Sequence, residues 1–196
     1  MRHVVIFARK PKLGCVKTRL ANDIGSVEAL RFYRSTLFAV ARRLSSGHAW
    51  TTWIAVTPDS ATRDAYPWPP NTPLLPQGSG DIGVRMARCM ARFGPFPVLI
   101  VGSDIPELGV RHIAKAFAAL RNNDFVFGPS SDGGYWLVGA VQGVRSGGLF
   151  EDVRWSTENT LSDTVENVRA GKRNAFIDVL SDVDNGEAYR ARGNKD

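Results

Sequence analysis

The chain has 196 residues, of which 43% are hydrophobic and 22% are charged, a composition typical of globular proteins. This excludes a wholly disordered, collagen-like or coiled-coil protein, and the length fits one domain over residues 1–196 with a sizeable hydrophobic core. Its 25 basic and 19 acidic residues give a net charge of +6, which on its own favours a polyanionic partner such as nucleic acid.

The first half of the chain predicts two strands around a long helix. Residues 4–8 form a short apolar run rich in β-branched residues, which predicts a buried strand that ends at a loop containing proline and glycine. Helical spacing of apolar residues from Ser26, a suitable N-cap, predicts a helix over 26–44. A strand follows over 52–57, and the proline-rich loop after it leaves room for at most a short strand at 74–75.

The second half continues the alternation of helices and strands. A helix is expected over 82–93, and 97–102 is the clearest buried strand of the sequence. A helix near 110–120, strands at 125–127 and 135–141, a helix near 161–168 and a strand at 175–180 complete the pattern. This alternation predicts an α/β domain with a mostly parallel sheet.

The loop after the first strand gathers much of the positive charge. Residues 1–43 hold ten basic and two acidic residues, a net charge of +8, so the remainder carries −2. Ligands of open α/β sheets bind at the carboxyl ends of strands, and lysine and arginine bind phosphate oxygens. The loop therefore favours a small phosphate ligand over a nucleic acid, with a solvated basic loop as the alternative. The cations around Gly14 are Arg9, Lys10, Lys12, Lys17 and Arg19.

Two nucleotide-binding motifs match only in part. Val16 stands before Lys17 where a P-loop has glycine, which argues against a P-loop NTPase. Residues 78–83 match GxGxxG, but Pro73 and Pro76 make the preceding segment a poor central strand. A glycine-rich turn that opens the next helix explains these residues better than NAD or FAD binding.

Acidic residues follow the later strands. Asp104 comes after the strand at 97–102, a place where its carboxylate could bind a metal ion that also contacts phosphates. The alternative is that Asp104 only caps the turn into the next helix. Asp182 and Asp184 follow the last strand, and one of them could be a second metal ligand or only close a turn. Residues 131–136 place Asp132, two glycines and two aromatic residues between strands, which suits either a tight turn or contact with substrate hydroxyls.

The cysteines, the histidines and the lengths of the apolar runs argue against other classes of protein. Cys15 and Cys89 cannot form a disulfide framework, and no spacing suggests zinc. The histidines lie in no triad-like context, so serine or cysteine hydrolase chemistry finds no support. No run reaches the roughly 18–20 apolar residues of a membrane span. We therefore expect reduced thiols, a cytoplasmic location and no membrane partner.

Four blocks of sequence together resemble a known bacterial family. They are residues 7–20, Gln77 with 80–86, residues 102–106, and residues 128–129 with 132–135. In this order they resemble the glycosyltransferase-like proteins of GT-A fold called radical-SAM/selenodomain-associated transferases, some of them linked to arsenosugar biosynthesis. The pattern is more distantly similar to 2-phospho-L-lactate guanylyltransferase and the molybdenum cofactor guanylyltransferase.

The resemblance implies a single-domain GT-A (nucleotide-diphospho-sugar transferase) fold with a mostly parallel central sheet flanked by helices. It implies that Mg²⁺ or Mn²⁺ is held by Asp104, with Asp184 as a second ligand, although the sequence after Asp184 departs from relatives that continue with Thr-Pro. The residues expected to bind the nucleotide are Ala8, Arg9, Lys10, Gly14, Lys17, Arg19, Gln77, Asp81 and Arg85. Those expected on the acceptor or sugar side are Asp132, Gly133, Gly134 and Tyr135.

The leading hypothesis is a metal-dependent glycosyltransferase with a nucleotide-sugar donor. In it Asp104, through the metal, and Lys17 with Arg19 neutralise the charge that develops on a diphosphate leaving group. The alternative within the same fold is a nucleotidyltransferase that joins a nucleoside triphosphate to a phosphorylated acceptor and releases pyrophosphate. A nucleic-acid-binding module and a non-catalytic nucleotide binder are the hypotheses from other classes.

Overall fold

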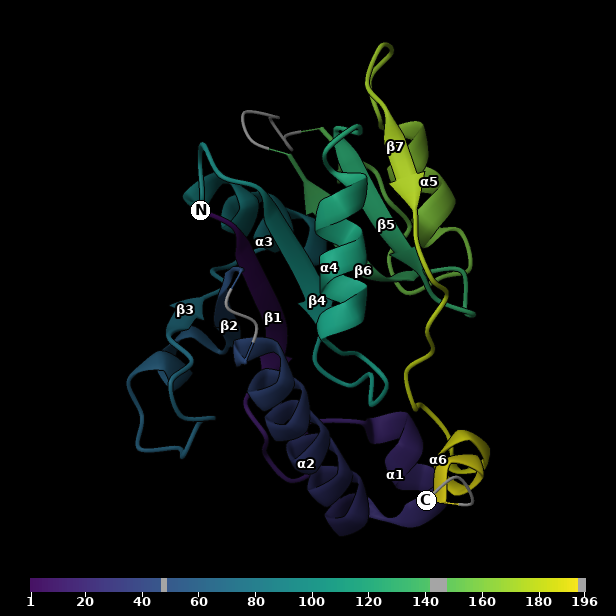
Figure 1. Cartoon of the computed structure of the whole chain (residues 1–196). Helices are drawn as coiled ribbons and strands as arrows, with labels where there is room; N and C mark the ends of the chain where they lie inside the picture. Colours follow the sequence, from purple (N-terminus) through teal and green to yellow (C-terminus); the bar gives the residue numbers. More distant parts are fainter. Residues whose placement is uncertain (47–48, 142–147, 194–196) are drawn as a thin grey trace.

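Within residues 1–46, 49–141 and 148–193, which a computed structural model of the chain describes, seven strands form one sheet in the order β3-β2-β1-β4-β6-β5-β7 (Figure 1). The strands are β1 (His3–Arg9), β2 (Thr51–Thr57), β3 (Leu74–Pro76), β4 (Val98–Gly102), β5 (Phe125–Pro129), β6 (Tyr135–Ala140) and β7 (Asn174–Phe176). β6 runs antiparallel to both of its neighbours, β4 and β5, and the other pairs are parallel. The α/β class and the mostly parallel sheet are therefore confirmed.

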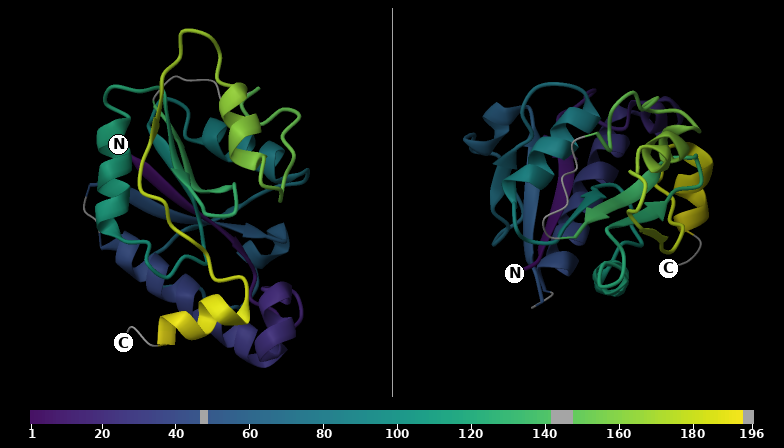
Figure 2. Two further views of the ribbon diagram at one scale, coloured as in Figure 1. Left: turned by 90° about the vertical axis from the view of Figure 1, so that its right-hand side faces the viewer. Right: turned by 90° about the horizontal axis from the view of Figure 1, so that it is seen from above.

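Helices cover both faces of this sheet. In the described part of the chain they are α1 (Thr18–Ile24), α2 (Ser26–Ser45), α3 (Ile82–Arg92), α4 (Val110–Ala119), α5 (Thr160–Glu166) and α6 (Gly186–Gly193), with a short 3-10 helix η1 (Asp59–Thr62). Figure 2 shows α2 and α4 on one side of the sheet and α3 and α5 on the other. None of the described helices is long and apolar enough to cross a membrane.

The alternation of side chains in β1 explains why both faces need cover. Val4 and Ile6 are fully buried in the core cluster that α2 and α4 complete, whereas Val5 is fully buried in the cluster on the side of α3. Because successive side chains of a strand point to opposite faces, an unbroken apolar run such as β1 requires helices on both. β1 therefore lies near the middle of the sheet, and its carboxyl end opens at the edge where the basic loop begins.

Three features of the fold differ from the sequence predictions. β7 is shorter than the strand expected at 175–180, and the antiparallel direction of β6 was not anticipated. The helices α1 and α6 were not predicted, because each is short and has few buried apolar residues; in α1 only Leu20 is buried. Such helices owe their stability to tertiary packing and leave a weak periodic signal.

The C-terminal segment crosses the carboxyl edge of the sheet. After β7 the chain runs as an extended strap to α6, which lies beside α1 (Figure 1). A small core cluster under α1, α2 and α6 holds the strap there; its buried members are Leu20, Ala29, Phe32 and Val183. This packing brings the end of the chain to the same edge as the loop after β1.

Candidate functional site

Three carboxylates meet at the carboxyl edge of the sheet. Asp104 follows β4 directly, while Asp182 and Asp184 lie on the strap between β7 and α6. One carboxylate oxygen of each residue lies within 4.8 Å of the corresponding oxygens of the other two. Residues from distant parts of the sequence therefore form one cluster of anionic oxygen atoms, which we call the carboxylate cluster.

The ammonium group of Lys17 lies inside the carboxylate cluster. Its Nζ is 2.7 Å from Asp104 Oδ2, 3.2 Å from Asp182 Oδ2 and 2.6 Å from Asp184 Oδ1. The Lys17 side chain is only 5% exposed, so water screens these contacts little. Its backbone has φ +47°, a left-handed conformation that persists in a residue with a Cβ only where the surroundings hold it. The cluster thus already binds one cation, supplied by the chain itself.

The cluster shifts the protonation equilibria of its members. Burial by itself would lower the pKa of Lys17, but the charges of Asp104 and Asp182 raise it above its ordinary value. Burial, together with repulsion from Asp104 and Asp184, raises the pKa of Asp182 to about 6 in spite of Lys17. Burial also acts upward on Asp184, but the hydrogen bond from Lys17 outweighs it and lowers that pKa. At pH 7 the cluster keeps an overall negative charge.

A buried residue on the strap aims the two C-terminal carboxylates. Val183 packs with Leu20 and Phe32 in the small cluster below α1 and α2. Its neighbours, Asp182 and Asp184, both reach the ammonium group of Lys17 instead. The apolar residue between the two acids therefore fixes the direction in which they point.

Tyr33 on α2 fastens the end of β1 to the end of β4. Its hydroxyl accepts a hydrogen bond from the backbone N–H of Arg9 at 2.9 Å and donates one to the carbonyl of Arg9 at 3.0 Å. The same oxygen lies 3.1 Å from Ser103 Oγ, next to Asp104. Burial raises the pKa of Tyr33 to about 12, so the phenol remains neutral and can donate. This contact sets the basic loop beside the metal candidate Asp104.

The basic loop lines a pocket of its own. This pocket has a volume of about 380 Å³, and Arg9, Lys10 and Lys12 line it together with the start of η1. Lys10 Nζ lies 2.5 Å from Asp64 Oδ2. Gly14 at the tip has φ +72°, which favours glycine. Of the predicted nucleotide-binding cations, Lys17 alone enters the carboxylate cluster, and Arg19, 76% exposed, lies 3.8 Å from Asp184 Oδ2.

Gln77 and Arg85 connect the ends of two central strands to α3. The buried amide of Gln77 donates to the carbonyl oxygens of Ala8 at 3.2 Å and Ala55 at 2.8 Å. Arg85 donates to Gln77 Oε1 at 3.1 Å. Asp81 accepts from the backbone N–H of Val84 and is the N-cap of α3. The turn in residues 78–83 thus opens a helix, as the sequence indicated.

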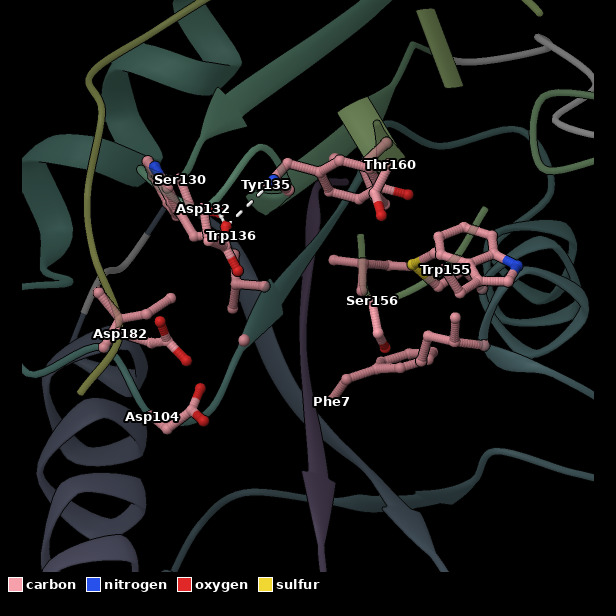
Figure 3. A pocket seen from close by; sticks show the side chains of 18 of the residues that line it. Phe7, Asp104, Ser130, Asp132, Tyr135, Trp136, Trp155, Ser156, Thr160 and Asp182 are labelled. Carbon is pink, nitrogen blue, oxygen red and sulfur yellow. Dashed lines mark hydrogen bonds between the residues drawn. The ribbon is translucent and has the colours of Figure 1, made fainter. Parts of the chain in front are cut away.

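A cavity of about 290 Å³ lies beside the carboxylate cluster. Asp104 and Asp182 line one end of it, and Tyr135 and Trp155 line the other (Figure 3). The predicted substrate residues Asp132, Gly134 and Tyr135 all belong to its wall. The structure therefore brings the predicted metal ligands and most of the predicted substrate residues to one site.

The turn before β6 shapes the middle of this wall. Asp132 Oδ1 accepts hydrogen bonds from Ser130 Oγ and from the backbone N–H of Gly134, the latter at 3.0 Å. Gly133 has φ +83°, and a Cβ there would overlap the backbone of Glu158. Gly133 is therefore required by close packing of the chain, whether or not it contacts a ligand.

Two wall residues were not singled out from the sequence. Trp155 lies in an irregular segment before α5, and Phe7 was counted only as part of the buried β1 strand. Tyr33 was likewise assigned only to the apolar face of its helix. An apolar residue looks the same in the sequence whether it fills a core or lines a cavity, so no local signal separates the two.

The fold and this site define a class of protein. Residues 40–157 match the family DUF2064, described as uncharacterized proteins conserved in bacteria, and the chain belongs to that family. A solved protein from Desulfovibrio desulfuricans, provisionally assigned as a nucleotide-diphospho-sugar transferase, has 29% sequence identity and a TM-score of 0.83, over 94% of this chain and 82% of its own. The fold is that of the nucleotide-diphospho-sugar transferases. No curated protein matches the sequence.

More distant structures share the fold alone. Rv0371c from Mycobacterium tuberculosis, solved in complex with manganese, has 16% identity and a TM-score of 0.54, over 97% of this chain and 96% of its own. CMP:2-keto-3-deoxy-manno-octonic acid synthetase, solved in complex with CTP, has 12% identity and a TM-score of 0.58, over 99% and 98%. Structures that bind nucleotides and a divalent metal are thus among the proteins with this architecture.

Proposed function

We propose that this protein is a divalent-metal-dependent glycosyltransferase with a nucleotide-sugar donor. The observation that carries the proposal is the convergence of Asp104, Asp182 and Asp184 on one bound cation, beside a cavity, at the carboxyl edge of this sheet. Ligands of open α/β sheets bind at that edge. The likeness to the transferase from Desulfovibrio desulfuricans supports the same class of reaction.

The carboxylate cluster suits Mg²⁺ or Mn²⁺. Both ions prefer oxygen ligands, and three carboxylate oxygens already lie within 4.8 Å of one another around a positive charge. Asp104 and Asp184, with Asp182 as a third ligand, would hold the ion. Bound there, the ion would supply electrostatic stabilisation of the negative charge that develops on a diphosphate leaving group. The manganese complex of a protein with this fold supports the assignment.

The basic residues then have a defined task. With Asp104 and Asp184 holding a metal ion, the ammonium group of Lys17 would be available to contact the diphosphate, together with exposed Arg19, which lies 3.8 Å from Asp184. In the transfer, an acceptor oxygen forms a bond to the anomeric carbon of the sugar and gives up its proton to water. The bond from that carbon to the diphosphate oxygen breaks, and the electron pair leaves with the nucleoside diphosphate. Lys17 and Arg19 would stabilise that leaving group.

Nucleotidyl transfer is the second candidate, because a synthetase that binds CTP has the same fold. The same cations would then hold a nucleoside triphosphate while a phosphorylated acceptor attacks its α-phosphorus. The products separate the two reactions: glycosyl transfer releases a nucleoside diphosphate, and nucleotidyl transfer releases pyrophosphate.

A thermal-shift panel of nucleotide sugars and nucleoside triphosphates, with and without Mn²⁺, tests the site. We expect stabilisation of several degrees by the nucleotides of one base, dependent on Mn²⁺, in the wild type and not in Asp104→Ala. Glu151→Gln is the control, since that exposed carboxylate lies outside the cluster and the cavity. The absence of any nucleotide-dependent shift in the wild type would overturn both transferase proposals.

A further inference from the structure

The cavity beside the carboxylate cluster has two chemically different ends. Asp104 and Asp182 stand at one end, and the opposite end is formed by Phe7, Tyr135 and Trp155 (Figure 3). Ile82 and Met86 of α3 extend the apolar wall. A ligand that fills the cavity therefore meets carboxylates on one side and aromatic and aliphatic side chains on the other.

Two threonine hydroxyls at the apolar end already donate hydrogen bonds within the protein, and the Tyr135 hydroxyl is buried without a hydrogen-bond partner among the described residues. Thr160 Oγ1 donates to the carbonyl of Arg154 at 2.8 Å, and so does Thr157 Oγ1. A sugar hydroxyl beside these two threonines would give up its bonds to water without receiving a hydrogen bond from either of them, which is unfavourable. An apolar group has no such requirement.

Several apolar side chains of this wall remain partly exposed. Phe7, Ile82, Tyr135 and Trp155 are only half-buried, although neighbours such as Met86 and Val138 are buried. Covering apolar surface yields about 25 cal/mol for each Å² removed from water. These side chains therefore offer binding free energy to a ligand with an apolar group.

The shape of the apolar end is fixed by close packing. Gly83 on α3 lies against Trp155, where a Cβ would come within 2.5 Å of the indole Cζ2 atom and 2.9 Å of Phe150 Cβ. Ser156, next to Trp155, has φ +60°, a left-handed conformation that the surrounding structure must hold. The volume of about 290 Å³ is small beside the roughly 300–1,000 Å³ of typical ligand pockets. The cavity thus accepts a compact group.

We propose that the acceptor substrate carries a compact apolar group, aromatic or branched aliphatic, which binds among Phe7, Tyr135 and Trp155. Its reacting oxygen then lies toward Asp104 at the other end of the cavity. The role of this molecule as acceptor rests on the function proposed above, whereas the binding of an apolar group at this place does not. Specificity for the acceptor is accordingly set by α3 and by the segment that carries Trp155.

Ligand-observed NMR on the full chain tests the proposal with two probes of similar size, 2-phenylethanol and glucose. We expect 2-phenylethanol to bind with a dissociation constant in the millimolar range and glucose to bind at least fivefold more weakly. Trp155→Ala removes one of the three aromatic side chains of the apolar end, and Ile82→Trp fills the cavity instead. Each variant should weaken 2-phenylethanol binding at least fivefold, so the result does not depend on one substitution folding correctly.

Val84→Trp is the matched control, because Val84 is exposed on the same helix, α3, and lies outside the cavity wall. The affinity of this variant for 2-phenylethanol should stay within twofold of that of the wild type. Equal or tighter binding of glucose, or unchanged 2-phenylethanol binding in both cavity variants, would overturn the proposal. Nucleotide-dependent thermal shifts without 2-phenylethanol binding would defeat this inference alone. Binding of 2-phenylethanol without any nucleotide effect would defeat the proposed function and leave the apolar subsite standing.

Discussion

Lys17 and the three carboxylates around it depend on one another. The ammonium group is nearly buried, and each carboxylate is partly buried, with 27–38% of its side chain exposed. Removing one charged side chain from a buried cluster leaves the remaining charges without a partner. This lowers the free energy of unfolding more than the loss of an exposed ion pair does. The carboxylate cluster therefore depends on a cation, which the Lys17 side chain supplies.

We expect Lys17→Met to lower the free energy of unfolding by about 3 kcal/mol without metal, because the carboxylates then repel one another. The same variant should bind Mn²⁺ more tightly than the wild type, since the ion no longer competes with an internal ammonium group. Urea unfolding and titration calorimetry measure the two effects. Lys115→Met, at an exposed pair with Asp178, should cost about 0.5 kcal/mol or less and leave Mn²⁺ binding unchanged. Weaker Mn²⁺ binding by Lys17→Met would contradict this account.

The pKa of Asp182, raised to about 6, predicts how Mn²⁺ binding varies with pH. Protonation of Asp182 removes a ligand and a charge, so affinity should fall up to about tenfold for each pH unit below 6 and level off above it. The free energy of unfolding without metal changes with pH in the opposite sense. Because the pKa is raised in the folded state, protonated Asp182 favours folding, and this contribution disappears as the pH rises through about 6. Mn²⁺ titrations followed by electron paramagnetic resonance should show the step, and Asp182→Asn should not.

The helix α2 positions the loop after β1 through one side chain, Tyr33. Tyr33 makes three polar contacts, two with the backbone of Arg9 and one with Ser103. The helix thereby fastens β1 to β4 at the edge where the carboxylate cluster forms. Loss of these contacts would free the basic loop as well as weaken the core.

Tyr33→Phe should lower the free energy of unfolding by about 1–3 kcal/mol, because it removes the part-buried hydrogen bonds between the Tyr33 hydroxyl and the backbone of Arg9. Chemical denaturation measures the loss. Tyr66→Phe is the comparison, since the Tyr66 hydroxyl is buried with no hydrogen-bond partner among the described residues; its removal should be neutral or stabilising. Equal losses in the two variants would show that the hydrogen bonds of Tyr33 are not the cause.

Contacts between the N-terminal helices α1 and α2 and the C-terminal helix α6 hold the site together. Gly186 at the start of α6 donates its backbone N–H to Asp23 Oδ2 at 2.7 Å. Tyr189 donates to Glu28 Oε1 at 2.7 Å and packs edge-on against Phe32, with ring centroids 5.4 Å apart. These contacts anchor the strap that carries Asp182 and Asp184. The N-terminal helices and the C-terminal helix thus act as one support for the carboxylates.

Tyr189→Ala should therefore weaken Mn²⁺ binding several-fold, although Tyr189 contacts none of the carboxylates in the cluster, because the strap loses an anchor. Tyr189→Phe keeps the ring contact with Phe32 and should retain most of the affinity. Calorimetric titration with Mn²⁺ compares the two variants with the wild type. Unchanged affinity in Tyr189→Ala, accompanied by reduced stability, would mean that the site does not rely on α6.

Local patterns in the sequence predicted much of this protein. The apolar runs and helical spacing located most of the described strands and helices within a few residues, and the alternation indicated an α/β domain with a mostly parallel sheet. Asp104 could be identified because the carboxyl end of a central strand is where ligands meet such a sheet. The family resemblance also rests on local blocks of sequence, and the DUF2064 match over residues 40–157 covers all of them except residues 7–20.

Long-range packing decided the rest. The sequence assigned Lys17 to phosphates, and only the folded chain shows its ammonium group among Asp104, Asp182 and Asp184. That meeting requires the strap after β7 to cross the sheet edge and Val183 to pack beneath α1. The reversed direction of β6 and the aromatic end of the cavity depend likewise on contacts between distant segments. Local periodicity specifies which residues are buried, but which buried surfaces face one another is settled by the packing of the whole chain.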